Sequence, residues 1–150
     1  MTAFPGASTS WPEGSGYGSP MSAAIDAVRA SYEAVNRGEI EAAMEALAPE
    51  AEWHESGALP EPPVHRGRDA IAAFLTDFLA QWESFEQELV EVRESGDKIG
   101  VFIHLTAVGR DSRIEVDARY AHVWTIRDGV GVRVDAYYER ANAEAALESA

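Results

Sequence analysis

The sequence SRIEVDARYAHVWTIR, residues 112–127, alternates between apolar and polar side chains with a period of two residues. Successive side chains of a β-strand point to opposite faces of its sheet, so this pattern predicts a long strand with one buried face. Asp128-Gly129 follows, and a second alternating stretch, VGVRVDAYYER, begins directly after it, which predicts a tight β-hairpin. The buried face of the first strand would carry Ile114, Val116, Ala118, Tyr120, His122, Trp124 and Ile126.

His122 is the one histidine on this otherwise apolar and aromatic strand face, between Tyr120 and Trp124. An imidazole can donate and accept protons near neutral pH, so His122 is a candidate catalytic residue in a pocket. The alternative is a neutral core histidine that is hydrogen-bonded to a tyrosine or to the backbone. The sequence leaves both open.

Composition limits the classes of function. A chain of 150 residues predicts one domain with a single core and room for a modest cavity. The formal net charge of -14 argues against nucleic acids and anionic membranes as partners, and favours a small neutral or apolar ligand. The absence of cysteine excludes disulfides and thiolate sites. With no signal-peptide pattern and no apolar run of membrane-spanning length, a cytoplasmic protein is the default expectation.

The first half of the chain predicts a tail and three helices. Residues 1–20 are rich in Gly, Ser and Pro, which predicts a disordered tail before a domain at 21–150. Apolar residues at helical spacing predict helices over 22–36, with Ser22 as N-cap, over 39–47, and over 69–82. Residues 51–55 predict a short strand, and the Pro-rich stretch 56–66 predicts an irregular loop that could form a rim or lid.

The second half predicts long strands over 85–95 and 98–110, the hairpin described above, and a short terminal helix over 143–149. Helices followed by strands indicate an α+β fold, with three N-terminal helices packed on a curved antiparallel sheet. Odd-numbered residues 99–107 and even-numbered residues 114–126 would face the helices. Phe102 and Val108 with His104 make the other face unusually apolar, which predicts a subunit interface and a homodimer.

Glu55 is the second candidate site residue. In a strand over 51–55 it shares a face with Ala51 and Trp53, and a carboxylate on an inward face is a candidate general base. The alternative is a solvated loop residue at a frayed strand end. Aromatic residues at such spacing form either plain core or the lining of a ligand pocket, and the candidates are Tyr32, Trp53, Tyr120, Trp124 and Tyr138. The histidines show no metal-binding spacing, so no metal and no cofactor are expected.

Three stretches together resemble the nuclear transport factor 2-like superfamily, in particular its SnoaL-like polyketide cyclase branch. They are YEAVNRGEIEAAMEALAPEAEWHE (32–55), HRGRDAIAAFL (65–75) and YAHVWTIRDGVGVRVDAYYER (120–140). The resemblance implies a cone-shaped fold around one pocket. It does not imply one function, because ketosteroid isomerases, cyclases, epoxide hydrolases, dehydratases and non-catalytic binding modules share this fold.

Residue by residue, the resemblance places Glu55 where ketosteroid isomerases carry their general base. His122 stands at the position of their oxyanion-binding Asp, and their helix-one Tyr falls on Ser31, beside Tyr32. Two of these three positions differ, which disfavours steroid isomerase activity. Ala136 replaces the Asp of epoxide hydrolases of this fold.

The leading hypothesis is a cofactor-independent isomerase, cyclase or another lyase-like enzyme that acts on a small apolar carbonyl or hydroxyl compound. Glu55 would move a proton, and His122 would stabilise or protonate the developing oxyanion. The alternative is a binding or assembly module of the same fold without chemistry.

Overall fold

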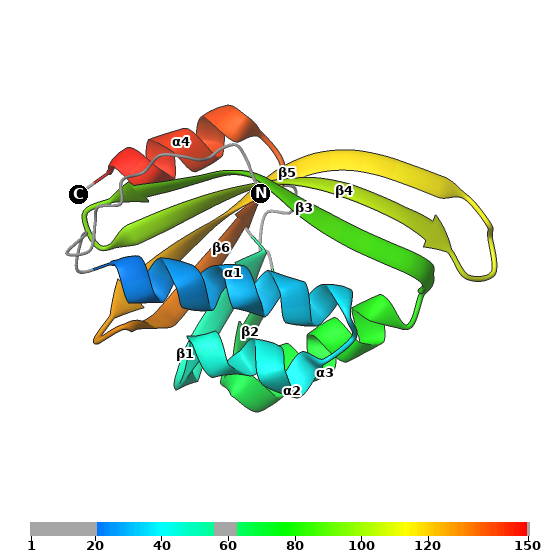
Figure 1. Cartoon of the computed structure of the whole chain (residues 1–150), viewed down its shortest axis with the longest axis horizontal. Coiled ribbons are helices and arrows are strands. Elements are labelled where there is room, and N and C mark those ends of the chain that lie inside the picture. The colour runs from blue at the N-terminus through cyan, green and yellow to red at the C-terminus, as the bar shows by residue number, and fades with distance from the viewer. Residues whose placement is uncertain (1–20, 56–62, 150) are drawn as a thin grey trace.

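A computed structural model describes residues 21–55 and 63–149, so the predicted tail and most of the Pro-rich loop lie outside the described residues. Helices α1, α2 and α3 cover one face of a curved six-stranded sheet, and α4 lies on the opposite face (Figure 1). The helices are α1 (Ser22–Asn36), α2 (Ile40–Ala43), the short 3-10 turn η2 (Met44–Ala46), α3 (Arg68–Leu79) and α4 (Arg140–Glu148). The strands are β1 (Leu47–Glu55), β2 (Val64–Arg66), β3 (Trp82–Ser95), β4 (Lys98–Gly109), β5 (Glu115–Arg127) and β6 (Val130–Tyr137).

The α+β architecture is confirmed, with one difference in strand pairing. The strand order is β2-β1-β6-β5-β4-β3, and each neighbouring pair is antiparallel except β1 and β6, which run parallel. β1 enters the sheet from the helical segment and lies beside the last strand, so the predicted meander accounts only for β3 to β6. The parallel pair sets the end of β1 next to the end of β6, where Glu55 pairs with Ala136.

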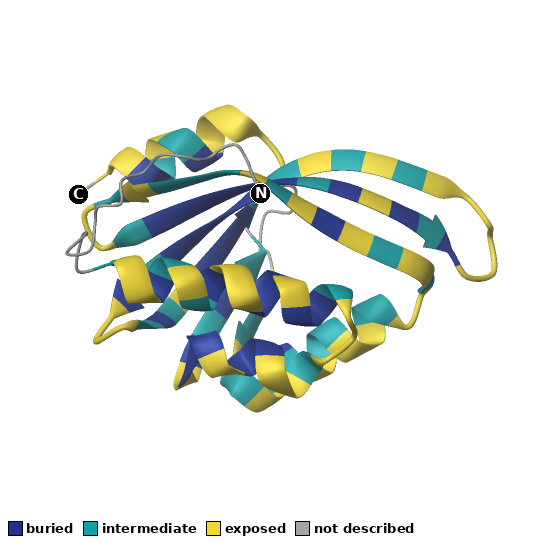
Figure 2. Ribbon diagram, in the orientation of Figure 1, coloured by how far each residue is buried: buried dark blue, intermediate teal, exposed yellow. Residues whose placement is uncertain are grey.

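Strands β4 and β5 present the predicted faces to the helices. Val101 and Trp124 are buried in the same core as Val28 and Val35 of α1. Asp128 and Gly129 both have positive φ, as a tight hairpin turn with the right-handed twist of its strands requires. Ile114 is the exception: it precedes β5 and is 62% exposed, because the far end of the β4–β5 hairpin projects beyond the helices (Figure 2).

Three stretches were assigned to the wrong type of structure. The second helix ends after one turn and a 3-10 turn, and Leu47 already belongs to β1. The third helix stops at Leu79, and Trp82 opens β3. The stretch predicted to be wholly irregular contains β2, because Val64–Arg66 completes the ladder along the edge of β1. In each case pairing with a neighbouring strand overrides the local helical or loop pattern.

Gly131 shows how closely the sheet approaches its own aromatic residues. An added Cβ would lie 2.7 Å from Cε3 of Trp124 and 3.3 Å from a methyl group of Leu47. No real Cβ tolerates the first distance, so the Trp124 ring occupies the space that a side chain at 131 would need. Glycine at 131 therefore determines where the Trp124 ring can lie.

Helix α4 covers part of the apolar outer face. Phe102 and Val123 are buried against Ala143 and Leu147 of α4, so the chain itself covers the part of the predicted subunit interface around Phe102. His104 remains half-buried between Glu88 and Asp117. The homodimer stays a prediction without the support of Phe102. No helix in the described parts of the chain is long and apolar enough to cross a membrane.

The α4 contact gives a stability test. Leu147 is 1% exposed, so Leu147→Ala should lower the free energy of unfolding by about 2–5 kcal/mol, since it leaves a cavity under the helix. Glu148→Ala, on the exposed side of the same helix, should change it by less than about 0.5 kcal/mol. Urea unfolding measures both, and similar values for the two variants would contradict the packing of α4 on the sheet.

Candidate functional site

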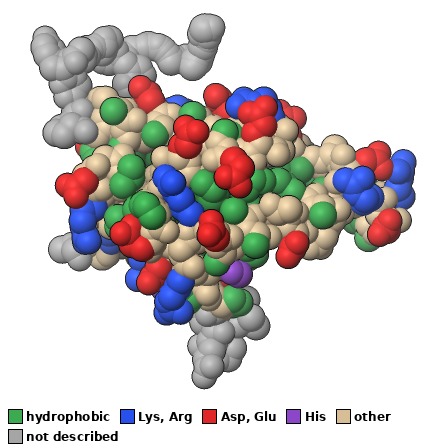
Figure 3. All heavy atoms as spheres, turned by 90° about the horizontal axis from the view of Figure 1, so that it is seen from below, with side chains coloured by type: hydrophobic (Ala, Val, Ile, Leu, Met, Phe, Trp, Pro, Cys, Tyr) green, Lys and Arg blue, Asp and Glu red, His purple; other side chains and the backbone are tan. Residues whose placement is uncertain are grey.

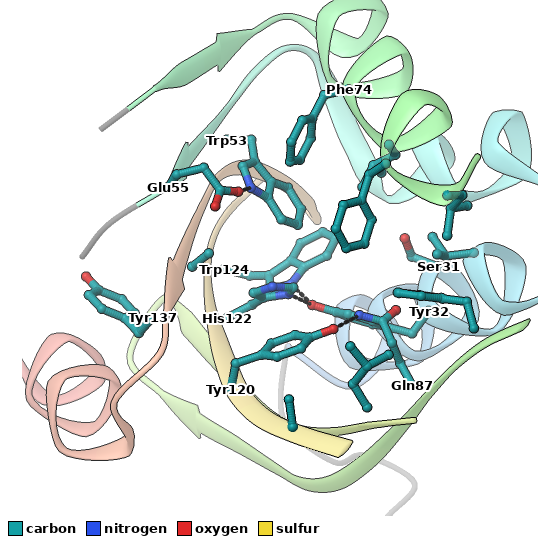
Figure 4. A pocket seen from close by; sticks show the side chains of 18 of the residues that line it. Ser31, Tyr32, Trp53, Glu55, Phe74, Gln87, Tyr120, His122, Trp124 and Tyr137 are labelled. Carbon is teal, nitrogen blue, oxygen red and sulfur yellow. Dashed lines mark hydrogen bonds between the residues drawn. The ribbon is translucent and has the colours of Figure 1, made fainter. Parts of the chain in front are cut away.

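One cavity of about 280 Å³ lies between the helix-facing side of the sheet and helices α1 and α3. Its lining is mainly apolar and aromatic, with side chains from β1, β3, β5 and β6 as well as from the two helices (Figure 4). Such a lining, with a few polar groups directed inward, is typical of a site for a small organic molecule. Each residue predicted for the site lies on this cavity: Tyr32, Trp53, Glu55, Tyr120, His122, Trp124 and Tyr138.

His122 lies at the inner end of the cavity and is 5% exposed. Its Nδ1 is 2.6 Å from the hydroxyl oxygen of Tyr32. The same oxygen accepts a hydrogen bond of 2.9 Å from Nε1 of Trp124. Burial lowers the pKa of His122 to about 3, because the surrounding protein disfavours the charged imidazolium. His122 is therefore neutral at physiological pH. His122 therefore combines the two alternatives that the sequence left open: it is a buried histidine bonded to a tyrosine, and it also faces a cavity.

Glu55 lies at the end of β1, where its backbone N–H donates to the carbonyl of Pro63. Its side chain accepts hydrogen bonds from Nε1 of Trp53 at 2.6 Å and from the hydroxyl of Tyr138 at 3.1 Å. Tyr138 is 60% exposed, which places it at the rim of the cavity. Glu55 is thus held by two donors near the rim and is not a free loop residue.

Trp53 links the two candidate residues. Its ring contacts the imidazole of His122 edge-on, with 4.9 Å between ring centroids, while its Nε1 holds Glu55 (Figure 4). Glu55 and His122 consequently face the same cavity with separate partners, and no ion pair joins them among the described residues. The carboxylate and imidazole are therefore disposed around the space that a ligand would occupy.

Gln87 is the main residue that the sequence analysis missed. It is buried on β3, and its Nε2 donates to the hydroxyl oxygen of Tyr120 at 2.6 Å. Asn36 at the end of α1 bonds both to the backbone N–H and to the backbone carbonyl of Gln87. The alternation of Phe85 and Leu89 would have placed Gln87 on the inward face, but the neighbouring glutamates obscured this signal.

Several other lining residues come from patterns that indicated plain core. Phe74 and Phe78 of α3 belong to the helical stripe, but they are only partly buried because they form one wall of the cavity. Ala136 lines the cavity where epoxide hydrolases of this fold carry an Asp. The carboxylate next to it in the sequence, Asp135, accepts two hydrogen bonds of 2.9 Å from Arg133.

Burial of Tyr120 and of Tyr32 raises the pKa of both phenols, that of Tyr120 to about 12. Both therefore keep their proton at physiological pH and can donate it. The cavity thus holds neutral hydrogen-bonding groups at its inner end and one carboxylate near its rim. Among the described residues no cluster of three His, Asp or Glu side chains could hold a metal ion.

The charge of the outer surface agrees with the composition. Figure 3 views the helix-covered side and shows acidic side chains spread around apolar ones, with Lys and Arg interspersed between them. This face has no continuous basic surface of the kind that binds a phosphate backbone.

The buried imidazole predicts a specific pH dependence of stability. The pKa of His122 in the folded protein, about 3, lies below its ordinary value of 6.5, so between these values the unfolded chain binds a proton that the folded chain does not. The free energy of unfolding should therefore fall as pH is lowered through 6.5. Between pH 7 and pH 5 this contribution is roughly 2 kcal/mol, and His122→Asn should remove it. Urea unfolding at both pH values measures the difference.

Tyr120→Phe keeps His122 in the same cavity and serves as the control. It should retain the full pH dependence of the wild-type protein. If the wild-type protein and His122→Asn lost equal stability between the two pH values, His122 would not be buried in its neutral form.

A family model identifies the family of this chain, and structure comparisons find the same fold in other proteins. The model of the SnoaL-like domain matches residues 28–134, and no protein of curated function matches the chain. An NTF2-like protein of unknown function from Burkholderia pseudomallei is 24% identical, with a TM-score of 0.69 over 87% of this chain and 100% of that one.

Two further structures of the same fold contain small molecules. TerC, co-crystallised with polyporic acid, is 24% identical, with a TM-score of 0.68 over 85% of this chain and 100% of that one. A Mycobacterium tuberculosis protein in complex with estradiol-17β-hemisuccinate is 18% identical, with a TM-score of 0.66 over 78% of this chain and 94% of that one. At these identities the likeness shows the fold alone. Because the family model covers most of the sequence, this chain belongs to the SnoaL-like family of the nuclear transport factor 2-like superfamily.

Proposed function

We propose that this protein is a cofactor-independent enzyme that transfers a proton on a small, largely apolar carbonyl or hydroxyl compound, as an isomerase, cyclase or lyase does. The observation that carries the proposal is the placement of one carboxylate, Glu55, and one neutral imidazole, His122, on the same apolar cavity. Two proteins of this fold hold small organic molecules, which supports a ligand in this cavity.

In this mechanism Glu55 accepts a proton from a carbon next to the carbonyl group. The electron pair of that C–H bond moves toward the carbonyl oxygen, which becomes an enolate. Because His122 is neutral, it would stabilise the enolate by donating a hydrogen bond and would keep its proton. The proton on Glu55 then returns to a different atom of the enolate, or it passes to a leaving group that departs from the β-carbon as the enolate collapses to the unsaturated carbonyl compound.

The apolar lining strengthens both roles. Most of the surface around the polar groups is aromatic or aliphatic, so bound ligand excludes water and each hydrogen bond acts in a medium of low dielectric constant. Tyr120 adds a second neutral donor, since its oxygen accepts from Gln87 and its own proton has no acceptor among the described residues. Two neutral donors are suited to an oxygen that gains charge during the reaction.

One observation favours a binding module without chemistry as the second candidate. Both oxygens of Glu55 already accept hydrogen bonds, from Trp53 and Tyr138. Each of these donors occupies an oxygen that would have to approach the C–H group of a ligand. The enzyme proposal therefore requires that ligand binding displace at least one of the two donors, and Tyr138 at the exposed rim is the one free to move.

Hydrogen exchange tests the proposal directly. A panel of small aryl and alicyclic ketones in D₂O should contain members whose α-protons exchange faster with the protein than without it, as followed by NMR. Glu55→Gln should abolish the acceleration, because an amide has a similar shape and cannot take the proton. Ketones that bind in the cavity and show no exchange would instead support the binding module.

His122→Phe tests the oxyanion role, because a phenyl ring has a similar shape and no N–H group to donate. The variant should slow the exchange by about 10²–10³-fold, the usual effect of removing one oxyanion donor, and should leave the circular dichroism spectrum unchanged. His104→Phe, on the outer face of the sheet, serves as the control and should exchange at the wild-type rate. Full activity of His122→Phe on a ketone that the wild type accelerates would remove His122 from the mechanism.

A further inference from the structure

We propose that Tyr32 is a positioning residue that holds His122 in the tautomer with its proton on Nε2, so that the cavity selects ligands whose buried end is a hydrogen-bond acceptor. The selection of ligands rests on the proposed function, whereas the tautomer is a property of the free protein. The donors and acceptors around Tyr32 determine which ring nitrogen of His122 carries the proton.

The hydroxyl oxygen of Tyr32 has two neighbours. The indole Nε1–H of Trp124 can only donate, so this oxygen is the acceptor of that bond. The remaining neighbour is Nδ1 of His122 at 2.6 Å. If Nδ1 carried a proton, both neighbours would donate to the same oxygen, and the hydroxyl proton of Tyr32 would have no acceptor among the described residues.

Burial makes that second arrangement unfavourable. Tyr32 is 5% exposed, and a buried hydroxyl proton without an acceptor destabilises the fold because it loses its hydrogen bond to water and gains none in return. The arrangement with all partners satisfied has Tyr32 donating to a bare Nδ1, which leaves the single proton of the neutral imidazole on Nε2. The lowered pKa of His122 and the raised pKa of Tyr32 agree with one neutral proton on each group.

Nε2 is the group that a ligand would meet. It lies on the side of the ring away from the β5 backbone, it belongs to a residue that lines the cavity, and no described residue bonds to it. With its proton in place it is a donor only. The Tyr120 hydroxyl beside it, with 5.3 Å between ring centroids, also has a proton to donate. A ligand that presents a carbonyl or enolate oxygen here satisfies these donors, whereas an ammonium group, which has no lone pair, does not.

The cavity volume limits the size of such a ligand. About 280 Å³ corresponds to the space of roughly nine water molecules at about 30 Å³ each. One or two rings with a short substituent fill this space. The inferred ligand class is therefore a one- or two-ring ketone or related oxygen acceptor, bound with its oxygen at the inner end of the cavity.

The tautomer can be measured without any ligand. In protein labelled with ¹⁵N-histidine, long-range ¹H–¹⁵N NMR spectra distinguish a protonated from a bare ring nitrogen, and His122→Asn identifies the His122 signals. Wild-type protein should show a protonated Nε2 and a bare Nδ1. Tyr32→Phe removes the hydrogen bond to Nδ1 and should give a mixture of the two tautomers. Ser31→Ala is the matched control, since it also removes a hydroxyl group of α1 at the cavity, but that hydroxyl bonds to the carbonyl of Ala43.

A matched ligand pair tests the selection. The ketone 2-acetylnaphthalene and the alkene 2-isopropenylnaphthalene have nearly the same shape, but only the ketone carries an acceptor oxygen. The wild-type protein and Ser31→Ala should bind the ketone about tenfold more tightly than the alkene, and Tyr32→Phe should lose most of this preference.

A proton on Nδ1 in the wild-type protein, or an unchanged tautomer in Tyr32→Phe, would overturn the positioning role. Equal affinity for the ketone and the alkene, or no binding of either, would overturn the inferred ligand class. Neither result depends on turnover, so an inactive protein with the expected tautomer and ligand preference would contradict the proposed enzyme function alone.

Discussion

The hydrogen bond between Tyr32 and His122 joins the first helix to the fifth strand across 90 positions of sequence, and the arrangement of the cavity depends on it. Three polar groups, from Tyr32, His122 and Trp124, lie in an otherwise apolar core, and each would destabilise the fold if it were left without a partner. Their mutual bonds satisfy them and determine where α1 lies relative to the sheet. The same bonds direct the imidazole toward the space that the helices leave open.

Glu55 experiences a different environment at the other end of this space. Trp53 lies on β1 with Glu55, whereas Tyr138 directly follows β6, which is beside β1 only because the two strands pair in parallel. The parallel pair is therefore the topological feature that brings a carboxylate from the first half of the chain to the cavity. The cavity thereby combines a buried inner end, which holds neutral hydrogen-bond donors, with a more exposed rim, which holds a carboxyl group.

Period-two alternation was the reliable part of the sequence analysis. It identified β5, the faces of β4 and β5, and the Asp128-Gly129 turn, because these features depend on side-chain direction along one strand. The resemblance to a known family added the cone-shaped arrangement. The covering of Phe102 by α4 and the parallel pairing of β1 could not be predicted, because they depend on contacts between distant segments. An apolar outer face therefore suggested a partner subunit where the chain supplies its own helix.

The candidate residues were predictable for a similar reason, but their chemistry was not. Patterning could place His122 and Tyr120 on an inward face, yet a lowered pKa for His122 requires knowing how deeply the folded chain buries the imidazole. Gln87 was missed because it is a single amide among glutamates, and the sequence did not show which face of this strand points inward.

Gly131 affects how a mutational screen of this protein should be interpreted. It makes no contact with the cavity, yet the ring of Trp124 rests where its side chain would be, and Trp124 in turn holds Tyr32. Any larger residue at 131 would push the indole away and release the hydroxyl that directs the proton of His122. A screen for loss of function would therefore return Gly131 together with the polar residues of the cavity, and its intolerance would reflect the hydrogen-bond chemistry of the site and not only backbone geometry.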